Sequence, residues 1–145
     1  MPLYQTTFEI DATADRVWSV LTDLDGYADW NPQIPQISGA LKKGSQIRLR
    51  LALPGKSPMD LSATIEDVKP GSLLTWRGYV VAPWFFEGHR RFEISPVTER
   101  HVRVTHVEDV RGLLAPLFSV FMGTAQQKSH DALNDALRNR AEAGE

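Results

Sequence analysis

The chain has 145 residues, a mass of 16.3 kDa and a formal net charge of -2, and 42% of its residues are hydrophobic. This length fits a single domain, because a fold of about 150 residues buries roughly 68–70% of the surface that its unfolded chain exposes. The absence of cysteine excludes disulfides, thiolate nucleophiles and cysteine-ligated metal centres. The balanced charge gives no general attraction to phosphates, so we expect no nucleic-acid partner.

No apolar run approaches the roughly 18 residues that a membrane-spanning helix needs, so we expect no integral membrane association. The first residues contain neither a basic segment nor an apolar one of the kind that directs secretion. We therefore expect a soluble cytoplasmic protein with one domain over residues 1–145. The sequence leaves a homodimer possible.

The N-terminal part of the chain combines strand and helix patterns. Residues 4–10 alternate between apolar and polar side chains, which is typical of a half-buried strand. Thr13 can cap a following helix, whose apolar residues recur at helical spacing to about Asp23. A glycine and two prolines then interrupt an aromatic-rich stretch, where we expect a brief helical turn and then a strand.

The middle of the chain predicts an antiparallel meander. Alternating apolar residues indicate strands over 47–53 and 59–66, each bounded by turn-forming residues. Further strands are expected over 73–76, 85–95 and 101–110, the last two forming a hairpin.

After Gly112 the hydrophobic period changes to that of a helix. We expect one amphipathic helix of about 24 residues, whose length of about 36 Å is enough to cross a twisted sheet. A single antiparallel sheet with apolar residues on one face, covered by this helix, is an α+β architecture in which a small-molecule cavity fits between the layers. The expected apolar stripe consists of Leu114, Leu117, Phe118, Phe121, Ala125, Ala132, Leu133, Ala136 and Leu137.

Several short motifs follow one another along nearly the whole chain. They are ADRVW at 14–18, YADWNP at 27–32, VKPG at 68–71, LTWRG at 74–78, FEISP at 92–96 and THVEDVRGLL at 105–114. In this order they resemble the START-like helix-grip superfamily (SRPBCC), in particular its bacterial polyketide cyclase/dehydrase and lipid-transport branch.

The resemblance implies a curved seven-stranded antiparallel sheet wrapped around a long C-terminal helix, with two short helices after the first strand. It also implies a cavity for hydrophobic ligands, in a superfamily that includes carriers, cyclases, hydrolases and regulatory domains. The position of Arg90 is often histidine in similar proteins, so this chain departs from them in a way that favours an anionic or carbonyl-bearing ligand. The activity itself has to be argued from the site.

Strict alternation along the last two strands predicts a buried polar cluster. If Phe92 and Val104 face inward, Arg90, His106 and Glu108 lie on the same face of the sheet. A buried arginine has to be paired, because an isolated buried charge costs more than a fold of this size tolerates. The cluster is either part of a ligand site or an internal ion pair near the end of the sheet.

The expected register of this hairpin pairs Ile94 with Val102, which places Arg90 opposite His106. Glu108 then lies diagonally from Arg90, within reach of a long side chain. The neighbouring residues, His89 and Arg91, have the opposite parity and are expected to face solvent.

The sequence provides little support for catalysis or for a metal. His106, Arg90 and Glu108 are weak catalytic candidates, because one histidine on a strand has no residue to orient it. The run Ser129-His130-Asp131 cannot form a triad on a helix, since successive side chains diverge by roughly 100°. The four histidines lack the spacing of a helical metal site, so we expect neither a metal nor another cofactor.

These observations favour a noncatalytic binder or carrier of a small hydrophobic or aromatic molecule, such as a lipid or polyketide-like compound. One alternative is a cyclase, dehydratase or hydrolase that acts on such a molecule in the same cavity. A second is a protein-interaction module, which clustered exposure of Trp84, Phe85 and Phe86 would favour. The expected ligand-binding residues are Trp30, Leu49, Leu61, Trp76, Trp84, Phe92, Val104, Phe118 and Phe121, with Arg90, His106 and Glu108 at the polar end of the ligand.

Overall fold

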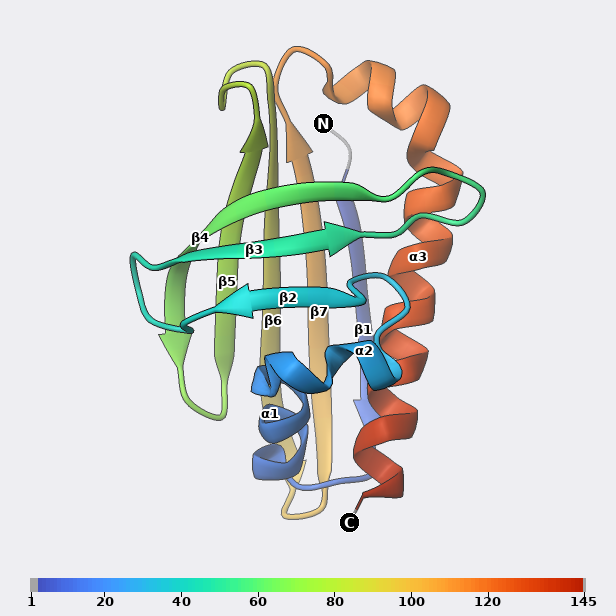
Figure 1. Cartoon of the computed structure of the whole chain (residues 1–145). Helices are drawn as coiled ribbons and strands as arrows, with labels where there is room; N and C mark the ends of the chain where they lie inside the picture. The colour runs from blue at the N-terminus through green and yellow to red at the C-terminus, as the bar shows by residue number, and fades with distance from the viewer. Residues whose placement is uncertain (1–2, 145) are drawn as a thin grey trace.

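A computed structural model describes residues 3–144 and contains one curved sheet of seven antiparallel strands beside a long C-terminal helix (Figure 1). Met1, Pro2 and Glu145, which the domain prediction includes, lie outside the described residues. The elements are β1 (Leu3–Ile10), α1 (Ala14–Thr22), the 3-10 turn η1 (Leu24–Gly26), α2 (Tyr27–Trp30), β2 (Gln36–Gly39), β3 (Gln46–Leu51), β4 (Met59–Lys69), β5 (Leu73–Val80), β6 (Phe86–Thr98), β7 (His101–Arg111) and α3 (Ala115–Ala143).

The strands follow the order β1-β7-β6-β5-β4-β3-β2, so that the first strand pairs with the last one and the rest form a meander. In Figure 1 the sheet curves until β2 and β3 cross over β6 and β7, while α3 runs along the side next to β1. This arrangement confirms the predicted helix-grip fold with short helices after the first strand. None of the helices in the described part of the chain has both the length and the apolar character needed to cross a membrane.

The start of α1 follows the local signal in the sequence. The backbone N–H of Arg16 donates to the Thr13 hydroxyl at 3.0 Å, which satisfies one of the free donors of the first helical turn. Val17, Val20 and Leu21 form the buried face of the helix. The amphipathic pattern therefore packs α1 into the core and leaves its polar side exposed.

The register of the β6–β7 hairpin differs from the expected one by two residues. Ile94 pairs with Val104 instead of Val102, and Arg90 lies directly opposite Glu108 instead of His106. A register irregularity between Pro96 and Thr98 absorbs the difference, because Pro96 rather than Ile94 faces Val102. The shift is an even number, so the inward face of each strand remains as predicted.

The helix α3 is 29 residues long, five more than expected, and its buried face differs from the predicted stripe. In its first half, Phe118, Met122 and Gln126 recur every four residues and face the sheet. Leu117 and Phe121 each lie one residue away, a rotation of about 100° that leaves them 52% and 68% exposed. The prediction was wrong at Leu117 and Phe121, because the inward face contains the polar Gln126, whereas Leu133 and Leu137 are buried as expected.

The apolar core has two main parts on the concave side of the sheet. One part, around Ile65, Leu74 and Trp76, fills the space under β2–β5. The other part packs α1 and the end of α3 against β1, β6 and β7, around Ile10, Val104 and Leu137. The first part adjoins the cavity described below.

Candidate functional site

A cavity of about 90 Å³ lies between the sheet and α3. Its walls are mainly apolar and come from β3, β4, β5, β6, β7 and α3, while polar groups gather where Arg90 and Glu108 meet Gln126. Leu49, Leu51, Met59, Leu61, Ala63, Trp76, Phe86, Val110 and Phe118 form most of the apolar lining.

An apolar groove of about 300 Å³ adjoins this inner cavity. The two spaces share Met59, Val80, Phe86 and Phe118, so they are neighbouring parts of one hollow. The groove extends to the surface of the molecule between the β5–β6 connection and the first turns of α3, where Leu117 is exposed. A molecule could therefore occupy the hollow with one end inside and the rest in the groove.

The polar end of the inner cavity is built around an ion pair between neighbouring strands. The Arg90 Nη2 donates to Glu108 Oε1 at 2.7 Å, and both side chains are more than nine-tenths buried. Arg90 Nη1 also donates to Gln33 Oε1 at 2.6 Å and to His106 Nε2 at 2.9 Å. Because Glu108 neutralises Arg90, the pair does not support the expected preference for an anionic ligand.

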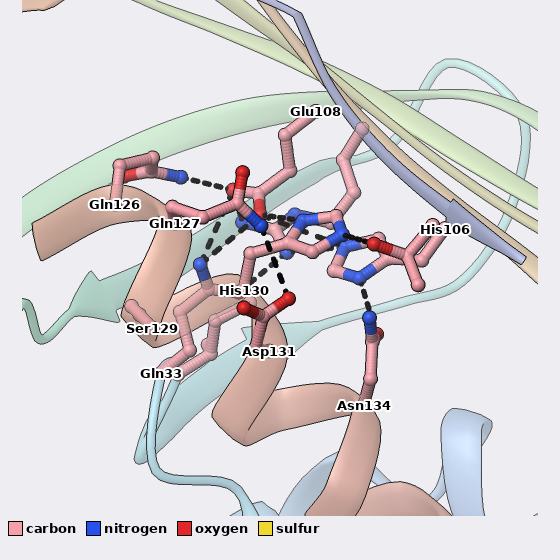
Figure 2. A network of polar contacts seen from close by, with 12 residues as sticks. Gln33, His106, Glu108, Gln126, Gln127, Ser129, His130, Asp131 and Asn134 are labelled. Atoms are coloured by element: carbon pink, nitrogen blue, oxygen red, sulfur yellow. Dashed lines mark hydrogen bonds and ion pairs between the residues drawn. The ribbon is translucent and has the colours of Figure 1, made fainter. Parts of the chain in front are cut away.

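Glu108 accepts hydrogen bonds from four side chains, those of Arg90, Gln33, Gln126 and His130. Figure 2 labels the last three of them around the carboxylate. His130 Nδ1 lies 2.6 Å from Oε2, Gln33 Nε2 lies 3.2 Å from each oxygen, and the amide of Gln126 donates to Oε1 together with Arg90. Burial alone would raise the pKa of Glu108, but the charge of Arg90 and the bond from His130 outweigh it and lower the pKa to about 2. The carboxylate is thus ionised and fully occupied, which makes it a poor general base.

His106 is held neutral behind this ion pair. Burial, followed by the charge of Arg90, lowers the pKa of His106 well below its ordinary value of 6.5. Its Nδ1 lies 2.7 Å from Asn134 Oδ1, so the Nδ1–H donates there and Nε2 accepts from Arg90. One ring face stacks on Phe92 with centroids 4.3 Å apart.

His130 covers the other face of His106. The two rings are nearly parallel, at 4°, and their centroids lie 4.0 Å apart. His130 bonds Glu108 through Nδ1 and the Thr6 hydroxyl through Nε2, so β1, β7 and α3 all contribute to the cluster. The stacked histidines fix how far α3 lies from the sheet at this point.

His106, Glu108 and His130 each bring a possible metal-ligand atom to within 4.8 Å of the others. The histidine spacing along the chain did not indicate this grouping, because the residues come from a strand and a helix. The atoms are already engaged: His106 Nε2 accepts from Arg90 and both Glu108 oxygens accept from side chains. A cation there would also lie close to the Arg90 guanidinium, so the donor set fits a hydrogen-bonded ion pair better than a metal.

The structure brings half of the predicted ligand-binding residues to the inner cavity. They come from the expected strands and from the expected helix, and they include both members of the buried ion pair. The residues of the prediction that line this cavity are Leu49, Leu61, Trp76, Arg90, Glu108 and Phe118.

Other predicted residues lie elsewhere. Trp84 is 68% exposed on the β5–β6 connection and packs edge-on against Phe85. Trp30 ends α2 and packs against both parts of the core, but it does not line the cavity. Phe121 lies in the outer groove, displaced by the helical rotation noted above.

The remaining predicted residues are buried behind the cavity wall. Phe92 has the inward parity but is covered by the His106 ring, and Val104 packs in the second part of the core with Ile94. His106 does not line the cavity, although it accepts a hydrogen bond from Arg90, which does. Strand parity identifies an inward side chain but does not tell which inward side chains other groups cover.

Sequence reasoning missed Gln33, Gln126, His130 and Asn134, which complete the polar cluster. The three helical residues recur at spacings of four and four, from 126 to 130 to 134, a pattern that places them on one face. That polar row was visible in the sequence, although its alignment with the inward face of β7 was not. Gln33 lies in a loop and gave no signal.

Known structures of the same shape support the fold. An aromatase/cyclase from Streptomyces sp. R1128 has a TM-score of 0.76 at 20% identity, covering 97% of this chain and 93% of its own. A START superfamily protein from Mycobacterium smegmatis has a TM-score of 0.75 at 21% identity, with 97% of each chain covered. Norcoclaurine synthase from Thalictrum flavum has a TM-score of 0.72 at 12% identity and covers 99% of this chain and 88% of its own.

The curved sheet, the long helix and the hollow between them form a helix-grip fold, which the START superfamily protein from Mycobacterium smegmatis shares. The chain belongs to the family described as polyketide cyclase / dehydrase and lipid transport, whose model matches residues 1–142. Among curated proteins, no sequence match is found. The family supports a ligand-binding or cyclase role.

Proposed function

We propose that the protein binds a small, mainly apolar molecule between the sheet and α3 without transforming it, as a carrier of a lipid or polyketide-like compound would. The observation that carries the proposal is the composition of the hollow, with mainly apolar walls and a polar end in which Arg90 and Glu108 neutralise each other. Burial of the ligand provides the driving force, at about 25 cal/mol per Å² before association costs.

The sizes of the two spaces suggest the shape of the ligand. Pockets for drug-sized molecules measure about 300–1,000 Å³, and the inner cavity of about 90 Å³ is well below that range. The groove of about 300 Å³ reaches the lower end of that range. A molecule with a narrow polar end in the cavity and an apolar body in the groove fits this arrangement.

The chemistry of the cluster favours binding over catalysis. A general base has to approach the substrate with a free lone pair, whereas Glu108 accepts from four side chains and has a pKa of about 2. His106 uses both ring nitrogens within the cluster. The likeness to an aromatase/cyclase keeps a cyclase as the second candidate, which would need Arg90 to polarise a carbonyl.

The third candidate, a protein-interaction module, has less support. This role was expected to show three neighbouring aromatic residues exposed at the surface. Trp84 is exposed, but Phe85 and Phe86 are half-buried. Phe86 packs on Phe118 with ring centroids 5.1 Å apart and thus belongs to the hollow.

Gly88 offers a direct test of the binding site. It lines the inner cavity, and a Cβ built on it meets no atom within 4 Å. Gly88→Leu should therefore fill the cavity without disturbing the sheet. We expect native mass spectrometry of gently purified protein, or of protein incubated with a cellular lipid extract, to show a bound small molecule on the wild type and none on Gly88→Leu.

Arg91→Leu is the matched control. It introduces a leucine into the same strand, but on the exposed outer face of the sheet. This variant should retain the adduct, and denaturing extraction then identifies the molecule. Equal adducts on the wild type and Gly88→Leu would place the binding site outside this cavity. Absence of any adduct on all three proteins after incubation would contradict the carrier role.

A further inference from the structure

Gln126 is a polar residue of the cavity with a buried hydrogen-bond acceptor that has no partner among the described residues. It lies on α3, lines the inner cavity and is 4% exposed. Its amide nitrogen donates to Glu108, but among residues 3–144 its Oε1 has no hydrogen-bond partner. Leaving a buried carbonyl oxygen without a donor is unfavourable, so this atom is an acceptor that a hydrogen-bond donor on a ligand would satisfy.

The orientation of this amide follows from its neighbour. Glu108 is an ionised carboxylate and can only accept hydrogen bonds, so the NH₂ end of Gln126 has to face it. Exchanging the two ends of the amide would place Oε1 against the carboxylate and lose the bond. The group of Gln126 that is left without a partner is therefore an acceptor and not a donor.

Arg90 lies on the same polar end and provides the complementary chemistry. Three of its hydrogen bonds go to Gln33, His106 and Glu108, whereas a guanidinium carries five N–H donors. Arg90 and Gln126 both line the inner cavity. A hydroxyl group can accept from an arginine N–H and donate to an amide oxygen at once, which a carbonyl or carboxylate cannot do.

We infer that the ligand carries a hydroxyl at its buried end, as an alcohol or phenol does, and that this hydroxyl donates to Gln126 Oε1. Oε1 is itself buried, so the proposed bond requires the Gln126 side chain to rotate and bring this oxygen to the cavity. The inference rests on the proposed binding function and adds the class of ligand. It differs from the anionic or carbonyl-bearing ligand that Arg90 alone would indicate.

Three model ligands of similar shape test the inference by isothermal titration calorimetry: 4-butylphenol, 4-butylanisole and butylbenzene. The anisole oxygen can still accept a hydrogen bond but can no longer donate one, so the difference between the first two ligands reports the donated bond. We expect the wild type to bind 4-butylphenol about tenfold more tightly than 4-butylanisole. In Gln126→Met, which preserves the volume of the side chain, the two affinities should agree within about twofold.

Gln127→Met is the control, because Gln127 is the exposed neighbour on α3 and its amide bonds Asp131 instead of Glu108. It should retain the preference of the wild type. Equal binding of phenol and anisole by the wild type would overturn the inference, and this comparison holds even if Gln126→Met fails to fold. A phenol preference that persists in Gln126→Met would overturn it too, whereas failure of all three ligands to bind would contradict the proposed function itself.

Discussion

At the scale of single residues, the site depends on one ion pair that is removed from water. Arg90 and Glu108 face each other across β6 and β7, and three further side chains complete the bonding of the carboxylate. Burying both charges is costly, and the cost is offset only while each group retains its partner. The pair therefore makes the structure sensitive to loss of either member alone.

We expect Arg90→Met to lower the free energy of unfolding by about 3–5 kcal/mol, because Glu108 is left buried without its cation. Glu108→Gln should also destabilise, since it leaves Arg90 unpaired. The double variant removes both charges and should recover most of the loss. Urea unfolding of the four proteins measures these effects, and a cost below about 1 kcal/mol for Arg90→Met would contradict the role given to the pair.

The neutral state of His106 predicts an acid-sensitive stability. Its pKa is lowered in the folded protein, so below about pH 6.5 the unfolded chain binds a proton that the native protein does not. The free energy of unfolding should therefore fall as the pH drops from 7 to 5, by up to about 1.4 kcal/mol per pH unit from this one group. The groups that face the ring are Arg90, Glu108, His130 and Asn134. All of them remain in His106→Gln, and this variant should show a smaller loss of stability per pH unit than the wild type.

His101→Gln is the control for this pH dependence. His101 lies at the exposed start of β7, where hydrogen bonds with Glu9 and Asp11 raise its pKa. Its contribution has the opposite sign, since it stabilises the protein below pH 6.5, so His101→Gln should steepen the acid loss or leave it unchanged. If His106→Gln retained the wild-type dependence of stability on pH, the assignment of His106 as neutral would be wrong.

Glu108 predicts a second loss of stability below about pH 4.5. Its carboxylate protonates there in the unfolded chain but not in the folded protein, so the loss should extend towards pH 2.

The sequence indicated part of this cluster for a physical reason. Side chains alternate strictly along a strand, so the parity that makes Phe92 inward also makes Arg90 inward, whatever the register. The partners on other elements could not be predicted in this way. Gln33 and Gln126 contact Glu108 because a loop and a helix pack against β7. The position of these elements along the strand depends on tertiary packing, which local sequence patterns do not predict.

At the scale of elements, two paired glycines on β5 and β6 differ in the space that surrounds them. Gly78 faces Gly88 in the ladder, and both line the inner cavity. A Cβ on Gly78 would lie 2.8 Å from the Ser62 carbonyl oxygen, whereas one on Gly88 meets nothing within 4 Å. The same substitution should thus have opposite effects at two neighbouring positions.

We expect Gly78→Ala to destabilise the protein by about 1–3 kcal/mol, because β4 has to move away from the new methyl group. Gly88→Ala should stabilise it by about 0.5 kcal/mol, because alanine restricts the unfolded chain and meets no obstacle. Chemical denaturation of both variants measures the difference. Equal effects at the two positions would show that the packing between β4 and β5 is looser than the structure indicates.

The elements themselves followed the sequence more closely than their pairing did. Alternation located the strands, and the helical period located α3, because both signals are local. The register of β6 and β7 was wrong by two residues, since the irregularity near Pro96 depends on how the turn closes. The inward face of α3 was predicted correctly at Leu133 and Leu137 but not at Leu117 and Phe121, because the site places polar residues on the inward face of the helix.

At the scale of the whole molecule, the helix-grip fold was predictable because its motifs extend over almost the full chain, and the family match over residues 1–142 agrees. The dimensions of the hollow were not predictable, since they depend on how far α3 lies from the sheet. The stacked rings of His106 and His130 contribute to that distance. The proposed function therefore requires that a ligand bind in the space beside this cluster.

The most direct test of that claim is a titration of isotope-labelled protein with 4-butylphenol, followed by two-dimensional NMR. We predict saturable shifts centred on the inner cavity, at Leu61, Trp76 and Gly88, with little change at the exposed Trp84. Shifts centred on Trp84 and the outer surface, or the absence of any saturable change in the cavity, would contradict the account.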